Sequence, residues 1–70
     1  MTDTMMLKEK IRENGYTITD IASLLGLSYM GFHKKLSNST EFKASEIATL
    51  RKSLKLTAKE ANQIFFVKSR

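Results

Sequence analysis

The sequence lacks cysteine and proline, and it holds only three glycines and one histidine among its 70 residues. Without cysteine the chain can form neither a disulfide nor a thiolate metal site. One histidine cannot supply a metal cluster, so we expect no metal and no cofactor. The absence of proline and the scarcity of glycine favour a helical domain with short turns. Its stability must come from close helix packing or from a partner, because such a length is near the lower limit for an unaided core.

Long apolar runs are also absent, and none approaches the roughly 18 residues of a membrane span. The chain starts Met-Thr-Asp-Thr, without the basic start and apolar centre of a signal peptide. We therefore expect an intracellular protein. Its length predicts a single domain over residues 1–70, with a core from about residue 5 to residue 67.

Negative charge is scarce: seven Asp and Glu stand against twelve Lys and Arg, which gives a net charge of +5. Such an excess on a small domain favours an anionic partner, usually nucleic acid or a membrane surface. Plain solubility is the simpler interpretation, since small domains often carry a few net charges. Charge alone leaves both interpretations open.

Apolar residues at helical spacing predict five short helices and no strand. The first helix covers residues 5–14 and ends at Asn14-Gly15, since both residues tolerate the left-handed conformation. The second follows the N-cap Thr17 and ends at Gly26. The residues expected on the buried faces of the five helices are Leu7, Ile11, Ile21, Ala22, Leu24, Leu25, Phe32, Leu36, Ile47, Leu50, Leu54, Ala61, Ile64 and Phe65.

The third helix follows the N-cap Ser28, and a polar loop at residues 37–40 comes after it. Phe42 is expected to anchor the chain beyond that loop. A fourth helix begins at Ser45 or one or two residues earlier, and a fifth follows the N-cap Thr57. The fold class expected is all-α: a compact domain of five helices around one core.

The second and third helices have the tightest connection in the chain, Leu25-Gly26-Leu27-Ser28. Two helices joined by three to four residues, often with a glycine, are typical of a helix-turn-helix. A DNA-reading helix needs one apolar stripe towards its core and polar or adaptable side chains towards base edges and phosphates. In "LSYMGFHKKLSNS", Phe32 and Leu36 form that stripe. The side chains expected on the exposed part are Ser28, Tyr29, Met30, His33, Lys34 and Ser37.

Gly31 leaves bare backbone within this third helix, which costs roughly 1 kcal/mol of helix stability against alanine. Close approach to DNA would explain the glycine. Close approach to the second helix would explain it equally well, so the sequence leaves the two explanations open.

The spacing of Ala22, Gly26, Phe32 and Leu36 resembles the helix-turn-helix of the Cro/C1-type, or XRE, family of phage repressors and bacterial regulators. The run "IASLLGLSYMGFHKKLSNSTEFKASEI" is similar to the branch whose motif ends in Lys-Leu, followed by a polar loop, a Phe and a helix carrying Glu-Ile. The tail "LKLTAKEANQIFF" resembles the last helix of small phage Cro-like and repressor proteins. The resemblance covers residues 5–66 and implies a lambda repressor-like fold.

The resemblance also implies roles for individual residues. The second helix of the family lies with its N-terminus on the phosphate backbone, and many members begin it with a glutamine where this chain has Ile18. Many members also carry glutamines at the base-reading positions. Here Tyr29 and Met30 suit contact with thymine methyl groups. The implied base contacts are Ser28, Tyr29, Met30, His33 and Lys34. The implied phosphate contacts are Thr17, Ile18, Thr19, Lys35, Ser37, Asn38, Ser39, Thr40 and Lys43.

Phe65 and Phe66 are adjacent, so on a helix they lie about 100° apart and one stripe rarely takes both. Phe65 fits the stripe of Ala61 and Ile64. Phe66 then either lies exposed as a dimer contact or closes the bottom of a small core. Both alternatives stay open.

The function expected from these features is a sequence-specific, double-stranded DNA-binding transcription regulator that occludes an operator. A length without room for a second domain favours a Cro-like protein or a repressor acting through DNA binding alone. We expect an operator duplex as the partner, in the cytoplasm of a bacterial host, and neither a membrane nor a small-molecule substrate. Binding by one copy and binding by a homodimer on DNA both stay open. No acid–base pair, phosphate loop or metal set indicates an enzyme. The alternative is a protein–protein module, anti-repressor or antitoxin-like, on the same scaffold.

Overall fold

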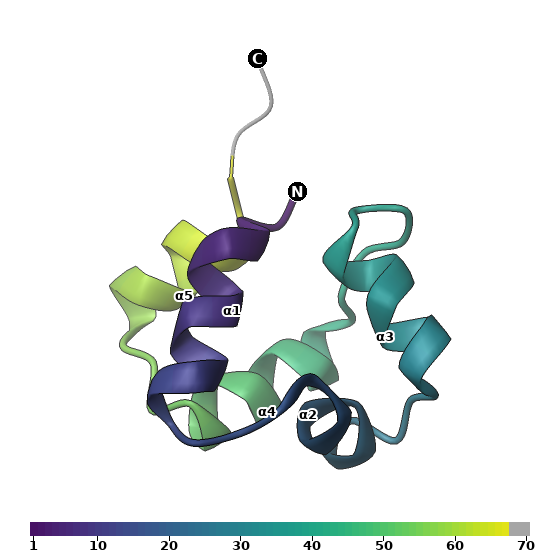
Figure 1. Ribbon diagram of the computed structural model, residues 1–70. Coiled ribbons are helices and arrows are strands. Elements are labelled where there is room, and N and C mark those ends of the chain that lie inside the picture. The colour runs from purple at the N-terminus through teal and green to yellow at the C-terminus, as the bar shows by residue number, and fades with distance from the viewer. Residues whose placement is uncertain (68–70) are drawn as a thin grey trace.

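Five α-helices and no strand make up residues 1–67, the part of the chain that the computed structural model describes. The helices are α1 (Thr4–Glu13), α2 (Ile18–Leu24), α3 (Tyr29–Leu36), α4 (Ala44–Ser53) and α5 (Ala58–Phe65). In Figure 1, α1 stands beside α5, and α4 crosses below them. α2 lies at the bottom and contacts α1 and α3, and α3 stands at the right. The all-α prediction is confirmed, and the α2–α3 pair is compatible with the expected helix-turn-helix.

Polar side chains fix the beginnings of four helices. The side-chain oxygens of Asp3, Thr17, Ser28 and Thr57 each accept a hydrogen bond from the backbone amide three residues later. These bonds satisfy amides that have no partner inside the helix. The predicted caps Thr17, Ser28 and Thr57 are confirmed, and α4 begins directly after Lys43.

The first four helices end with the same backbone turn. The residue after each C-cap has a positive φ: 79° at Gly15, 69° at Gly26, 64° at Asn38 and 54° at Lys55. Each of these residues donates its amide to the carbonyl three residues back, and the next residue donates to the carbonyl five residues back. This is the Schellman turn, in which glycine is usual and asparagine is tolerated. Lys55 is the unexpected residue in the series.

The hydrophobic core draws on all five helices and on the chain before α5. Phe42 lies partly buried after the α3–α4 loop, with ring centroids 6.1 Å from Phe32 and 5.5 Å from Phe65 in edge-on geometry. The predicted anchor role of Phe42 is thus confirmed. The buried apolar residues are Leu7, Ile11, Ile21, Ala22, Phe32, Leu36, Leu50, Leu54, Leu56, Ala61, Ile64 and Phe65.

Leu24 departs from the predicted core, because 49% of its surface is exposed. At about 100° per residue, Ile21, Ala22 and Leu25 already occupy the inward side of α2. Leu24 therefore points away from the core at the end of this short helix.

The two ends of the described chain are hydrogen-bonded to each other. The Val67 amide donates to the Met1 carbonyl at 3.1 Å, and the Asp3 amide donates to the Ile64 carbonyl at 2.6 Å. The start of α1 is therefore held against the end of α5. Across residues 1–67, no helix has the length and apolar character needed to cross a membrane.

Candidate nucleic-acid interface

α3 is divided into a buried stripe and an exposed face. Phe32 and Leu36 are buried, whereas Tyr29 is 54% exposed and Met30 is 63% exposed. Because the buried pair fixes the rotation of the helix about its axis, the exposed side chains keep a defined direction. The predicted base-contact residues on this face are Tyr29, Met30, His33 and Lys34, and all are exposed.

The N-cap of α3 explains the surroundings of Gly31. The Gly31 amide donates to Ser28 Oγ at 3.0 Å, and the Ser28 hydroxyl proton remains available to a further acceptor. A Cβ added at Gly31 would meet Ser28 Oγ at 3.2 Å, and no atom of α2 lies within 4 Å of it. Close packing against α2 is therefore not the reason for this glycine. Close approach of DNA to this glycine stays a prediction.

A hollow of about 160 Å³ joins α3 to α1 and to the beginning of α2. Four predicted DNA contacts, Ile18, Tyr29, His33 and Ser37, line it together with Thr4, Lys8 and Leu36. The rings of Tyr29 and His33 lie 6.1 Å apart between centroids, with a tilt of 52°. The structure thus brings residues from three elements to one surface.

Lys8 is a cation of this hollow that the sequence analysis did not single out. It follows the core residue Leu7, so it lies about 100° from the buried side of α1. That position on the edge of the buried face is the signal that could have identified it.

Carboxylates are absent from the central part of the candidate interface, between Asp20 and Glu41. Residues 21–40, which include most of α2, the turn, α3 and the polar loop, contain no Asp or Glu. Within residues 1–67, Lys34 forms no ion pair. The charge of Lys34 is therefore free to attract an anion.

Lys35 does not face an external phosphate, which corrects the prediction for this residue. Its ammonium lies 2.7 Å from Glu46 Oε1 and also donates to the Glu41 carbonyl at 3.2 Å. Lys35 and Glu46 are both buried. A buried ammonium needs such partners, because leaving water without them is costly.

Glu46 connects three parts of the chain through one carboxylate. Its Oε1 accepts from the ammonium of Lys35 on α3 and, at 2.8 Å, from the backbone amide of Lys43 before α4. Burial opposes ionisation of Glu46, yet these two hydrogen bonds outweigh it and hold the pKa of the carboxyl below its usual value. Glu46 thereby positions α3 against α4. Its place three residues after the N-cap is the sequence signal for this role.

Side chains of the loop after α3 differ in their hydrogen-bond partners: some bind within the loop, and one binds the N-terminal segment. Ser37 Oγ donates to the Lys34 carbonyl at 3.1 Å and lies 3.2 Å from Ser39 Oγ. Asn38 is engaged: its Oδ1 accepts from the Thr2 amide at 2.7 Å and its Nδ2 donates to the Thr2 carbonyl at 3.1 Å. The side-chain amide of Asn38 thus holds the N-terminal segment, and its phosphate role stays a prediction. The predicted phosphate contacts in and after this loop are all exposed: Ser37, Asn38, Ser39, Thr40 and Lys43.

Thr17 and Asp20 form a capping box at the beginning of α2. Asp20 donates its amide to Thr17 Oγ1 at 3.1 Å, and its carboxylate accepts from the Thr17 amide at 2.8 Å. Within residues 1–67, the amides of Ile18 and Thr19 have no acceptor. The Asp20 carboxylate opposes a phosphate at this end, so these amides make a weaker anion site than a bare helix terminus.

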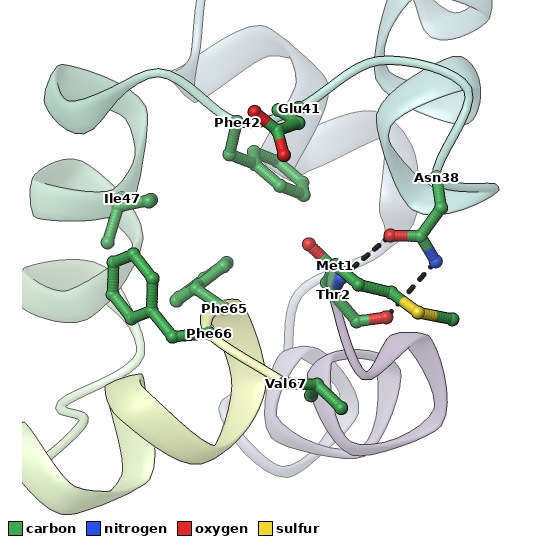
Figure 2. Close-up of a pocket in the computed structure, with 9 residues that line it drawn as sticks. All are labelled: Met1, Thr2, Asn38, Glu41, Phe42, Ile47, Phe65, Phe66 and Val67. Atoms are coloured by element: carbon green, nitrogen blue, oxygen red, sulfur yellow. Dashed lines mark hydrogen bonds between the residues drawn. The ribbon is translucent and has the colours of Figure 1, made fainter. Parts of the chain in front are cut away.

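Phe66 projects from the end of α5. Its side chain is 60% exposed, whereas Phe65 is buried. Figure 2 shows Phe66 at a hollow of about 310 Å³, where Ile47, Phe42 and Met1 also lie. Closing the core is therefore not the role of Phe66, and the dimer contact stays a prediction.

In the part of the chain that the structure describes, no group of three or more His, Cys, Asp or Glu residues is placed to hold a metal ion. Searches with protein-family models and among curated proteins find no match to this chain.

Proposed function

We propose that the protein is a sequence-specific, double-stranded DNA-binding transcription regulator that reads the major groove with α3. The observation that carries the proposal is the division of α3: Phe32 and Leu36 anchor the helix, while Tyr29, Met30 and Lys34 are exposed. The absence of carboxylates from residues 21–40 supports it, because a phosphate backbone would be repelled by them.

Recognition would combine charge attraction with direct contact to base edges. Tyr29 and Met30 suit apolar contact with thymine methyl groups, and the Ser28 hydroxyl can donate to a base or a phosphate. Lys34 suits guanine O6 and N7 or a phosphate. The loop hydroxyls, with Lys43 and Lys8, would follow the backbone on either side.

The regulator we propose is a phage-type Cro-like protein or repressor in a bacterial host. It would act by occlusion, since a domain that covers an operator blocks access of polymerase to the same DNA. The resemblance of residues 5–66 to the Cro/C1-type family supports this assignment. A second copy on the operator would give the two-fold symmetric half-sites of dimeric helix-turn-helix proteins.

The decisive experiment is a selection from a randomised duplex pool at moderate salt, read out by sequencing. An enriched palindrome supports specific recognition by two copies, and a single short half-site supports recognition by one. Retention of all sequences without enrichment, with strong salt dependence, would contradict the proposal.

Charge reversal at Lys34 tests which face binds. We expect Lys34→Glu to abolish specific binding, and Lys34→Gln to reduce the slope of log affinity against log salt by about 0.9 if this side chain contacts a phosphate. Lys59→Glu on α5 is the matched control, since it changes the net charge equally. Equal losses from Lys34→Glu and Lys59→Glu would mean that only overall charge drives binding.

A protein–protein module on the same scaffold is the second candidate function. Exposed apolar side chains favour it: Leu24, Tyr29 and Met30 lie in water at the end of α2 and the start of α3. A protein partner would tolerate Lys34→Glu better than DNA would. No enrichment in the duplex selection would favour this candidate.

A further inference from the structure

α4 carries a shallow, open hollow that the proposed DNA-binding face does not include. Its volume is about 550 Å³. Four apolar residues and three cations line it: Ala44, Ile47, Ala48, Leu56, Arg51, Lys52 and Lys55. We call this surface the α4 groove. No carboxylate is among its lining residues.

The α4 groove lies on the side of α4 that is turned away from α3. Glu46 marks the side towards α3, because its carboxylate binds Lys35. At about 100° per residue, Ala44, Ala48 and Arg51 project roughly opposite Glu46. The α4 groove can therefore be occupied while the exposed side chains of α3 bind another molecule.

Lys55 stands at the end of the α4 groove in a backbone conformation that disfavours lysine. Its φ is 54°, and the equivalent turns after α1, α2 and α3 use Gly15, Gly26 and Asn38. A non-glycine residue in this region is strained, and retained strain is more frequent at functional sites. Lysine adds a cation beside Lys52 that glycine or asparagine would not supply.

The cations of the groove are not neutralised within the described chain. Residues 1–67 provide no ion pair to Arg51, Lys52 or Lys55, although Arg51 Nε donates to the Leu56 carbonyl at 3.3 Å. The bond turns the guanidinium towards the C-terminal end of α4. Apolar contact area with cations along its rim is complementary to an amphipathic helix with acidic flanks.

We propose that the α4 groove binds an acidic amphipathic helical segment of a partner protein. Apolar side chains of that segment would pack on Ile47 and Ala48, and its Asp or Glu residues would pair with Lys52 and Lys55. A second copy fits less well, because two-fold pairing of identical grooves brings cations against cations. A nucleic acid also fits less well, because its phosphates would meet an apolar floor.

A display library of random 16-residue peptides, selected against the full chain, tests the proposal. We expect enriched peptides to carry apolar residues three to four positions apart, flanked by Asp and Glu. Binding of the enriched peptide, measured by fluorescence anisotropy, should fall about tenfold or more in Ala48→Lys and in the double variant Lys52→Glu/Lys55→Glu. Ala48 is exposed on a helix, so circular dichroism should show that Ala48→Lys remains folded.

Ala58→Lys on α5 is the matched control for Ala48→Lys. The double variant Arg12→Glu/Lys59→Glu, at exposed positions outside the groove, matches the charge change of Lys52→Glu/Lys55→Glu. Both controls should leave peptide affinity unchanged. Enriched peptides without an acidic bias, or with equal affinity for Ala48→Lys, would overturn the proposal. The proposal would also be overturned if duplex DNA of unrelated sequence displaced the peptide and if Lys52→Glu/Lys55→Glu lost binding to that DNA. The groove would then be a nucleic-acid surface. Sedimentation as a dimer that Ala48→Lys converts to a monomer would assign the groove to a second copy.

Discussion

The Lys35 ammonium lies 2.7 Å from Glu46 Oε1, and both residues are buried between α3 and α4. The pair therefore belongs to the interior of the domain and fixes α3 relative to α4. Next to it in sequence, Lys34 is exposed and has no ion-pair partner within residues 1–67. Adjacent lysines of one helix thus have different roles.

We predict that Lys35→Met lowers the free energy of unfolding by about 3 kcal/mol, because removing one partner leaves a buried charge uncompensated. Glu46→Gln should cost less, since the amide oxygen can still accept from Lys35 and from the Lys43 amide. Urea denaturation followed by circular dichroism measures both. Lys34→Met is the control, and its stability should stay within about 0.5 kcal/mol of the wild type. Equal effects at both lysines would contradict the distinct role of Lys35.

Gly31→Ala separates helix stability from access to DNA. Alanine gains up to about 1 kcal/mol of helix propensity, and displacement of Ser28 Oγ, 3.2 Å from the new Cβ, removes part of that gain. We therefore expect Gly31→Ala to raise the free energy of unfolding by between about 0 and 1 kcal/mol. The variant should also bind the selected duplex more weakly. Thermal melts and anisotropy titrations measure the two quantities. Unchanged affinity would remove close approach to DNA as the reason for this glycine.

Lys55→Gly should stabilise the domain by about 0.5–1 kcal/mol, because glycine relieves the left-handed strain but loses some conformational entropy on folding. The same variant should weaken binding of the peptide selected on the α4 groove. Lys52→Gly is not a suitable comparison, since it lies inside α4 and would destabilise it. Lys55→Asn is a suitable comparison, because asparagine also tolerates the left-handed conformation. A loss of stability in both variants would show that the lysine side chain itself supports the fold.

Acid should destabilise the domain through its glutamates. The Lys10 ammonium, 2.8 Å from Glu60 Oε2, and the Thr57 amide lower the pKa of Glu60 from 4.5 to about 2. A lowered pKa in the folded state adds stability that is present above about pH 4.5 and is lost as the pH falls towards about 2. The lowered pKa of Glu46 acts in the same direction.

The measurement is the melting temperature between pH 7 and pH 2. Glu60→Gln should melt at a lower temperature than the wild type at pH 7 and should show a shallower decline with acid. Glu9→Gln serves as the control, because Glu9 is exposed and forms no ion pair within residues 1–67. Parallel declines in Glu60→Gln and the wild type would contradict the assignment.

Phe66→Ala tests the dimer hypothesis. The ring is mostly exposed, so the variant should remain folded with a stability change below about 1 kcal/mol. If Phe66 contacts a second copy, sedimentation velocity at high concentration should show less self-association in the variant. A folded variant with unchanged sedimentation would remove this contact.

Periodicity and capping rules predict most of the helical framework. The N-caps Thr17, Ser28 and Thr57 and the turn at Gly26 are confirmed, because each is set by contacts among residues close in sequence. Core positions follow from the same spacing, with Leu24 as the exception on a helix whose inward side is already filled.

Residue roles that depend on distant partners could not be predicted in this way. Lys35 looks like a surface residue in the sequence, yet it is buried against Glu46, 11 residues away along the chain. Asn38 is exposed, but its side chain binds Thr2, 36 residues away. Helical periodicity and capping rules describe residues close in sequence, so they give no information about such distant pairs. The left-handed conformation of Lys55 could not be predicted either, since lysine is not a residue that signals a helix-ending turn.

The hydrogen bonds between the two ends of the described chain have a consequence for synthesis on the ribosome. Val67 and Ile64 hold Met1 and Asp3, and α1 packs on α5, with Leu7, Ile11 and Ile64 in the shared core. A nascent chain that has released only α1 to α4 therefore exposes the apolar side of α1 and lacks its partner. The domain can close only when α5 has left the exit tunnel, so truncations before α5 should be degraded rather than accumulate as a smaller folded protein.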